Sequence, residues 1–316
     1  MNSAIHTHQL AKHFRHTEAL RGVDLDVPQG SIYALVGANG AGKTTLIKLL
    51  MNILRASAGS SQVLGMDSHR LTGAAFERIG YVSENEEMPE SMTVAAFLDY
   101  MRPFYSQWDR ELERQLIRQF DLPLKRKLRH LSRGMRMKAA FASSLAYRPA
   151  LLVLDEPFSG LDPLVRDELI ESLLDSAPET TIFLSSHDLA EIESFASHLG
   201  YLEEGRLLFS EEMASLSARF REVTVTLPQT ATLPANMPAA WLLPETSDSV
   251  LRFVHSRFRE GETERELAAE FPSATDISCE AMPLRSIFLA MARTGRDRKP
   301  AAAPSSASAA ERSVTA

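Results

Sequence analysis

Three short apolar stretches of the chain each run directly into polar residues. They are SIYALV (31–36), ALLVLDEP (150–157) and TTIFLSSHD (180–188). Nearly continuous apolar strands are typical of a parallel sheet that is covered on both faces. Ligands of such sheets bind at the carboxyl ends of the strands. The pattern therefore predicts an α/β fold with a parallel sheet, in which three polar strand ends face one crevice.

A helical pattern occupies the region between the first two of these strands. Residues 109–120 (DRELERQLIRQF) start with a capping residue and repeat apolar residues at helical spacing. We expect an inserted α-helical subdomain over about residues 85–147. Further on, LGYLEEGRLLFS (199–210) predicts a hairpin that closes the core near residue 218. The cap and the apolar face of the predicted helix are Asp109, Leu112, Leu116 and Phe120.

The last third of the chain has a different pattern and no catalytic motif. Its segments alternate between strand-like and helix-like, which predicts a small C-terminal α+β appendage over residues 219–294. The composition from Gly295 onward is of low complexity, which predicts a disordered tail over residues 295–316. The expected strands are REVTVTL, SVLRFVHSRF and ATDISCEAM, and the expected helices are ETERELAAEF and PLRSIFLAMART.

Composition adds limits on compartment and partners. The chain has 316 residues, of which 44% are hydrophobic and 24% are charged, enough for a substantial core. Its net charge of −7 gives the whole molecule no general attraction to polyanions. The single cysteine, Cys279, excludes an intrachain disulfide and suggests either a reducing compartment or indifference to redox conditions. Because we find neither a signal-peptide pattern nor an apolar run of about 18 residues, we expect a soluble cytoplasmic protein.

The first polar strand end, GANGAGKTT, matches the phosphate-binding loop G-x-x-x-x-G-K-[ST] in full. In this motif the backbone N–H groups surround phosphate oxygens, and the following helix adds its positive end. The lysine reaches the β- and γ-phosphates, and the hydroxyl of Thr44 is placed for Mg²⁺. The sequence therefore predicts a P-loop NTPase core that binds a nucleoside triphosphate with Mg²⁺. The expected nucleotide-binding residues of the loop are Gly37, Ala38, Asn39, Gly40, Ala41, Gly42, Lys43, Thr44 and Thr45.

The other two polar strand ends supply candidate catalytic groups. Asp155 is expected to bind Mg²⁺ directly or through a water molecule, and Glu156 to accept a proton from the attacking water. An acidic pair at a strand end can also cap the next helix, but that alternative does not explain its place beside a P-loop pattern. A lone histidine is usually structural, yet the position of His187 at the end of a third core strand favours a functional role.

With these motifs, the chain resembles the nucleotide-binding subunits of ABC transporters over about residues 1–218. LSRGM (131–135) is similar to the family's signature sequence, SGLDP (159–163) to its D-loop and SSHD (185–188) to its histidine switch. The resemblance implies that Asp162 contributes to the nucleotide site and that His187 contacts the γ-phosphate. It also implies that Phe14 stacks on adenine.

The signature lies within the most basic part of the chain, KRKLRHLSRGMRMK (125–138). Ser132 is a natural helix N-cap, and Gly134 would leave free N–H groups facing an anion. The resemblance implies a head-to-tail dimer, in which Ser132 and Gly134 close over the ATP of a second nucleotide-binding subunit. Whether that subunit is a second copy or a different chain stays open.

Two residues depart from the family pattern. Arg133 replaces the first glycine of the signature pair, which is acceptable if its side chain points away from the nucleotide. Glu84 stands where the family's Q-loop usually carries glutamine, and its carboxylate could still meet Mg²⁺ or its water. Without the metal, the same carboxylate would repel the γ-phosphate. We expect ATP hydrolysis to survive both departures.

The expected protein is an ATPase subunit that drives a separate integral membrane transporter, of the exporter type, from the inner face of the membrane. The main alternative is a soluble ABC ATPase acting on nucleic acid or ribosomes, but such relatives usually join two ATPase units or carry a long coiled coil. A P-loop GTPase would need an Asn-Lys-x-Asp run, which the sequence lacks. A metal site at four N-terminal histidines is disfavoured because no cysteine or acid completes a ligand set. These histidines are His6, His8, His13 and His16.

Overall fold

The computed structural model describes residues 3–84, 87–176, 179–233 and 237–297. The chain divides into two compact units, and the division falls between Leu216 and Ser217. No helix among the described residues is both long enough and apolar enough to cross a membrane.

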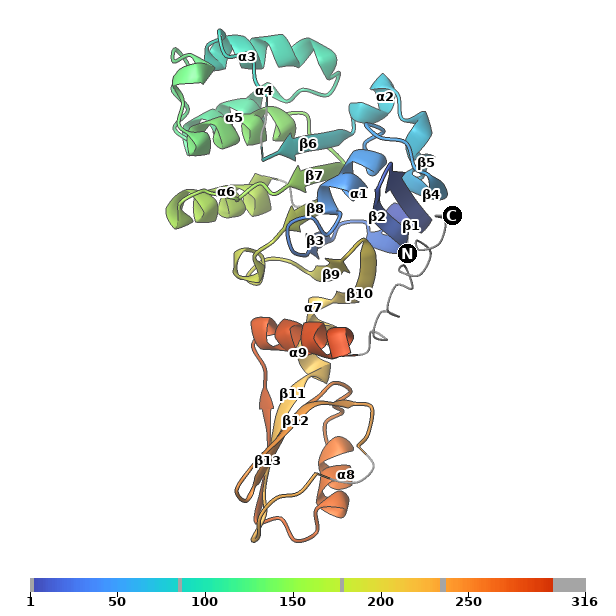
Figure 1. The fold of residues 1–316 in the computed structure, drawn as a ribbon. Coiled ribbons are helices and arrows are strands. Elements are labelled where there is room, and N and C mark those ends of the chain that lie inside the picture. Colours follow the sequence, from blue (N-terminus) through green and yellow to red (C-terminus); the bar gives the residue numbers. More distant parts are fainter. Residues whose placement is uncertain (1–2, 85–86, 177–178, 234–236, 298–316) are drawn as a thin grey trace, which may run out of the picture. The chain divides into compact units, whose positions relative to one another are not determined.

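A six-stranded sheet forms the centre of the first unit (Figure 1). Its strand order is β10-β9-β3-β8-β7-β6, and all neighbouring pairs are parallel except β10 with β9. This arrangement confirms the predicted α/β fold with a parallel sheet. The strands are β3 (Ile32–Val36), β6 (Ile79–Ser83), β7 (Leu151–Asp155), β8 (Thr181–Ser186), β9 (His198–Glu203) and β10 (Arg206–Glu212).

The three predicted polar strand ends lie beside one another in this sheet. Val36, the last residue of β3, pairs with Ser186 at the end of β8. Asp155, the last residue of β7, pairs with Ser185 of the same strand. The apolar residues of β7 and β8 are fully buried, as expected for strands covered on both faces. The P-loop, the acidic pair and His187 therefore start from one edge of the sheet.

A second sheet in this unit is antiparallel and was missed by sequence analysis. Its order is β2-β1-β4-β5, and its buried side chains join those of β3 and of helix α1 (Lys43–Leu50) in one hydrophobic core. The pairing of β1 with β2 shifts register at four places along the strand, so the apolar residues of β1 do not alternate regularly. Its strands are β1 (Ser3–Phe14), β2 (Thr17–Pro28), β4 (Ala58–Val63) and β5 (Met66–Asp67).

The predicted helical insert is present, and α5 packs against β6 (Figure 1). Asp109 caps α4 by accepting hydrogen bonds from the N–H groups of Glu111 and Leu112. The predicted apolar face, Leu112, Leu116 and Phe120, is buried. The insert contains α3 (Val94–Met101), η2 (Arg102–Phe104), α4 (Arg110–Gln119), η3 (Leu128–His130) and α5 (Arg133–Leu145).

Five further helices among the described residues complete the first unit. They are η1 (Ser68–Arg70), α2 (Gly73–Phe76), α6 (Pro163–Ser176), η4 (Leu189–Glu191) and α7 (Met213–Arg219), which ends beyond the division between the units.

The second unit is an antiparallel sheet of order β12-β13-β11-β14 with two helices. All three strands and both helices predicted here are present, whereas β12 was missed. Helix α9 includes residues 295–297, so the predicted tail starts too early; the rest of that tail, 298–316, lies outside the described residues. The elements are β11 (Arg221–Thr226), β12 (Trp241–Ser247), β13 (Val250–His255), α8 (Thr263–Glu270), β14 (Asp276–Ala281) and α9 (Leu284–Asp297).

Candidate nucleotide site

The glycine-rich loop connects β3 to α1, as its motif requires. At Gly37, a side chain is excluded because a Cβ atom would lie 2.2 Å from the carbonyl oxygen of Leu202. Gly42 has a φ of 111°, a conformation that side chains rarely adopt, and its Cβ would lie 2.7 Å from the oxygen of Ala19. The two glycines thus let the loop turn tightly against its neighbours before the helix begins.

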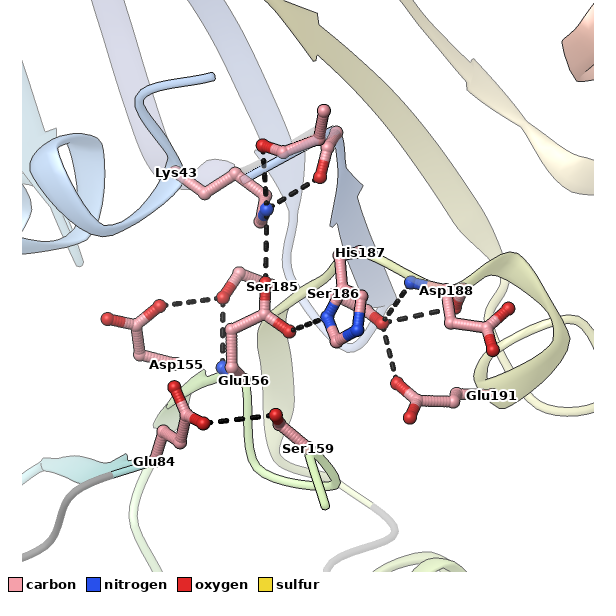
Figure 2. A network of polar contacts seen from close by, with 12 residues as sticks. Lys43, Glu84, Asp155, Glu156, Ser159, Ser185, Ser186, His187, Asp188 and Glu191 are labelled. Atoms are coloured by element: carbon pink, nitrogen blue, oxygen red, sulfur yellow. Dashed lines mark hydrogen bonds and ion pairs between the residues drawn. The ribbon is translucent and has the colours of Figure 1, made fainter. Parts of the chain in front are cut away.

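Lys43 is buried at the first turn of α1, with 5% of its surface exposed. Its Nζ donates to the carbonyl oxygens of Gly37, at 2.6 Å, and Ala38, at 3.3 Å. Nζ also lies 3.0 Å from Oε1 of Glu156, an ion pair without hydrogen-bond geometry (Figure 2). A buried ammonium is stable only with such partners, so these contacts fix the charge beside the loop.

Thr44 and Asp155 meet where α1 approaches the end of β7. The hydroxyl of Thr44 donates to Oδ1 of Asp155 at 3.1 Å. Oxygen atoms of this kind are the ligands that Mg²⁺ prefers, usually with only one or two carboxylates beside phosphate and water oxygens. The described residues contain no group of three His, Cys, Asp or Glu side chains that could hold a metal by themselves. The donor set therefore fits a Mg²⁺ ion that arrives with a phosphate ligand.

Glu156 is held in an unusual backbone conformation between the side chains of Lys43 and His187. Its φ is 51°, the left-handed region that non-glycine residues seldom occupy. Its Oε2 lies 2.7 Å from Nδ1 of His187 (Figure 2). That hydrogen bond raises the pKa of His187 above its ordinary value. Glu156 as a whole is 9% exposed, so neighbouring protein groups, and not bulk water, set the position of its carboxylate.

Ser185 is a further polar residue of the site that sequence analysis missed. Its hydroxyl donates to Oδ1 of Asp155 at 2.7 Å and accepts from the backbone N–H of Glu156 at 3.0 Å. One buried hydroxyl thus orients both members of the acidic pair. The signal in the sequence was the polar serine inside the otherwise apolar run TTIFLSSHD.

A pocket of about 420 Å³ adjoins these groups. Its walls include the P-loop residues Asn39, Gly40 and Gly42–Thr45, together with Glu84 and Glu156. The remaining wall comes from the β1–β2 hairpin and the turn after β9, which sequence analysis did not assign to the site. These additional residues are Thr17, Glu18, Ala19, Arg21, Glu204 and Gly205.

Phe14 lies outside the wall of this pocket. Its side chain is 45% exposed at the end of β1, and Nζ of Lys12 lies 5.0 Å from the centre of its ring. The ring therefore has one open face on the strand that leads into the hairpin wall. Its expected stacking on adenine stays a prediction.

The signature residues also lie apart from the pocket wall of their own chain. Ser132 caps α5, its Oγ accepting from the N–H of Met135 at 3.3 Å. A Cβ at Gly134 would lie 3.0 Å from Cγ1 of Val165, so this glycine permits close packing of α5 on α6. Oδ1 of Asp162 caps the same helix α6 by accepting from the N–H of Val165 at 3.0 Å. Each of these residues has a structural contact, beside which its expected role toward a nucleotide stays a prediction.

The two residues that depart from the family pattern contact each other. Nη2 of Arg133 lies 3.0 Å from Oε1 of Glu84, and the hydroxyl of Ser159 donates to the same oxygen at 3.0 Å. The hydrogen bond from Arg133 lowers the pKa of the Glu84 carboxyl. The side chain of Arg133 thus points toward Glu84 of its own chain.

Other cations of the basic stretch are also engaged within the chain. Arg136 donates to the carbonyl oxygens of Leu128, at 3.2 Å, and Arg129, at 3.4 Å. Nζ of Lys138, a buried residue, lies 2.5 Å from Oε2 of Glu168. These contacts give Arg136 and Lys138 structural partners within the chain.

Acids do lie beside the N-terminal histidines, contrary to the reason given against a metal site there. They come from β2 as single partners, and no group of three ligands forms among the described residues. The pairs are His6–Asp26 at 3.5 Å, His8–Asp24 at 3.4 Å and His13–Glu18 at 3.6 Å.

Comparison with known proteins places this geometry in a family. Residues 20–159 match the ABC transporter family. An ABC transporter ATP-binding protein of Synechocystis is 36% identical over 63% of this chain, but the match spans only 58% of that relative. A bacitracin transport ATP-binding protein of Enterococcus faecalis is 31% identical over 71% of this chain and 74% of its own length.

Solved structures agree with this result. An ATP-binding subunit of an ABC transporter superposes with a TM-score of 0.62 and 28% identity, covering 68% of this chain and 92% of that protein. The similarity to this protein thus includes both the fold and the sequence. The chain belongs to the ATP-binding proteins of ABC transporters.

Proposed function

We propose that this chain hydrolyses ATP and thereby powers a separate membrane-spanning ABC transporter subunit. One observation carries the proposal: Lys43, Thr44 and Glu156 line one pocket. Asp155 and His187 stand directly behind it, hydrogen-bonded to Thr44 and Glu156. A P-loop alone binds phosphate, whereas the added carboxylates provide places for a metal ion and for a proton.

The phosphates of ATP would bind to the backbone N–H groups of the loop and to the positive end of α1. Lys43 would contact the β- and γ-phosphates from its buried position at the first turn. Thr44 and Asp155 would hold Mg²⁺, with Glu84 beside them at the pocket wall. When bound, Mg²⁺ supplies positive charge that offsets the charge of the phosphate oxygens.

Glu156 is the proposed general base. Its Oε1 contacts Lys43, so movement of the ammonium toward a phosphate would leave this oxygen free to accept a proton from water. Its Oε2 stays with His187, which holds the carboxylate in place and can itself contact the γ-phosphate. The hydroxyl of Ser185 fixes the backbone of Glu156 during these steps.

The exposed start of α5 supports a two-chain site. Ser132 lies outside the pocket of its own chain, although its helix N-terminus suits an anion. We infer that this turn, with Gly134 and Asp162, closes over the ATP of a second nucleotide-binding subunit. Closure with ATP and reopening after hydrolysis would shift the membrane partner between conformations.

Two relatives support a role in export. One is named for bacitracin transport, and another, from Streptomyces peucetius, for daunorubicin and doxorubicin resistance; the second is 35% identical over 65% of this chain and 64% of its own length. We propose an exporter-type ATPase that works on the cytoplasmic face of the membrane. Selection of the transported compound would belong to the membrane partner.

The test of the proposed function replaces Glu156 by Gln. The side chain keeps its size but loses its basicity, so ATP turnover by the purified protein should fall about 10²- to 10⁴-fold. Binding of ATP should persist, because the P-loop and Lys43 are unchanged. Turnover near the wild-type rate would show that another group accepts the proton, and loss of binding would show that the substitution damaged the site itself.

A further inference from the structure

The contact between Arg133 and Glu84 joins the start of helix α5 to the end of strand β6. Glu84 directly follows β6 in the core, and Arg133 is the first residue of α5, 49 positions later. A Cβ at Gly160 would lie 3.0 Å from Nη1 of Arg133, so the guanidinium also packs against the turn after Ser159. One side chain thus connects the start of the signature helix to the Q-loop and the D-loop of its own chain.

The carboxylate of Glu84 also borders the pocket that contains Thr44. The backbone N–H of Glu84 donates to the carbonyl oxygen of Asp155 at 2.8 Å, which anchors Glu84 beside the strand that carries the metal-ligand candidate. Glu84 therefore stands between two cation sites: the guanidinium of Arg133 and the place where Mg²⁺ would bind.

We propose that Arg133 is a positioning residue that competes with Mg²⁺ for the carboxylate of Glu84. This inference rests on the proposed ATP site. With no metal bound, Arg133 neutralises Glu84 and so reduces its repulsion of ATP. When Mg²⁺ enters with ATP, the carboxylate turns toward the metal, and the first turn of α5 loses one link to the core. Because the competition is reciprocal, breaking the ion pair should strengthen the response to Mg²⁺.

The size of the effect follows from exposure. The side chains of Arg133 and Glu84 are 45% and 37% exposed, so solvent screens their attraction. Exposed ion pairs of this kind correspond to changes of about two- to fivefold in an equilibrium constant. The effect should therefore be graded and should be largest at low salt.

The experiment compares four full-length chains, all carrying Glu156→Gln so that ATP is not consumed. They have the wild-type pair, Arg133→Met, Glu84→Gln, or both substitutions. Binding of a fluorescent ATP analogue is measured first in EDTA and then during a Mg²⁺ titration. Arg129→Met serves as the control, because it also removes a positive charge from the basic stretch. The guanidinium of Arg129 donates to His130 and not to Glu84.

Arg133→Met should change binding in opposite directions in the two conditions. Without metal, the analogue should bind about two- to fivefold more weakly, because an unpaired carboxylate faces its phosphates. With Mg²⁺, the metal concentration at half-saturation should fall about two- to fivefold. Neither change should occur in the Glu84→Gln background, and Arg129→Met should leave both values unchanged.

A different result would overturn the inference. General damage to the site would weaken binding in both conditions, and an effect that persists with Glu84→Gln would show that Arg133 acts through another group. An unchanged Mg²⁺ response would likewise contradict the competition. If the parent chain bound no ATP analogue in any condition, the proposed function itself would fail, which is a distinguishable outcome.

Discussion

At the scale of residues, Glu156 lies between a lysine and a histidine, and each of its oxygens faces one of them. Lys43 is buried by the P-loop, whereas the side chain of His187 is 41% exposed. The lysine contact ties the carboxylate to the phosphate loop, and the histidine contact ties it to the end of β8. The two contacts give both oxygens of a largely buried carboxylate a nitrogen partner.

The pair of His187 and Glu156 predicts a dependence of stability on pH. The pKa of His187 is raised above 6.5, chiefly by the hydrogen bond with Glu156. The pair therefore stabilises the fold fully below pH 6.5, and the stabilisation is lost as the pH rises through the higher pKa of the folded state. Because His187 is partly exposed, His187→Asn should lower the unfolding temperature by only about 1–2 °C at pH 6, and by less at pH 9.

Thermal unfolding at both pH values, without nucleotide, measures this difference. His16→Asn is a matched control, since His16 is an exposed histidine in the turn between β1 and β2. A loss of stability that is equal at pH 6 and pH 9 would mean that His187 contributes by packing and not by charge.

The site residues at the ends of parallel strands could be predicted from the sequence, whereas those from other elements could not. The P-loop, Asp155, Glu156 and His187 could be placed together because parallel strands bring their carboxyl ends to one edge. Arg21 and Glu204 reach the pocket from antiparallel hairpins whose register no motif specifies. The contact of Arg133 with Glu84 could not be predicted either. A single sequence gives no sign that two departures from a family pattern, 49 positions apart, lie together in space.

At the scale of elements, the parallel sheet was predictable and the antiparallel sheet of the first unit was not. Strands β7 and β8 are continuous apolar runs, so their burial could be predicted directly. Strand β1 mixes histidines with scattered apolar residues and bulges, so it gives no clear period of two. The helical insert was predicted well because α4 has a cap and a regular apolar face.

A buried ion pair stabilises that insert. Glu113 of α4 is 3% exposed and accepts hydrogen bonds from Arg102 and from the indole of Trp108. Glu113→Ala would leave the indole of Trp108 without its acceptor and Arg102 with Asp99 alone, and should lower the free energy of unfolding by about 2 kcal/mol. The partial exposure of Arg102, 27% for its side chain, keeps the expected loss below that of a fully buried pair.

Urea unfolding followed by the fluorescence of Trp108 measures this loss. The sequence contains two tryptophans, so a Trp241→Phe background leaves Trp108 as the reporter. Glu111→Ala in the same helix is the control, because its side chain is 63% exposed and should contribute about 0.5 kcal/mol or less. Equal effects of the two substitutions would contradict the role of the buried network.

At the scale of the whole molecule, the proposed ATP site draws on two surfaces of the first unit. One surface is the P-loop pocket with its carboxylates, and the other is the exposed N-terminus of α5. The second unit has its own hydrophobic core of seven buried residues, so its packing does not depend on completion of the ATP site. In the proposed function a single chain carries both halves of the site, and two chains must join to complete it.

Mixing two inactive variants tests this claim most directly. Lys43→Ala should disable the P-loop of one chain, and Ser132→Arg should block the signature turn of the other. Each variant alone should show almost no ATP turnover. In the mixed dimer, the intact P-loop of the second chain faces the intact signature of the first, so turnover should reappear, up to about half of the wild-type rate if the sites act independently. If the mixture stays as inactive as its components, or if either variant alone turns over ATP at the wild-type rate, the two-chain site is contradicted.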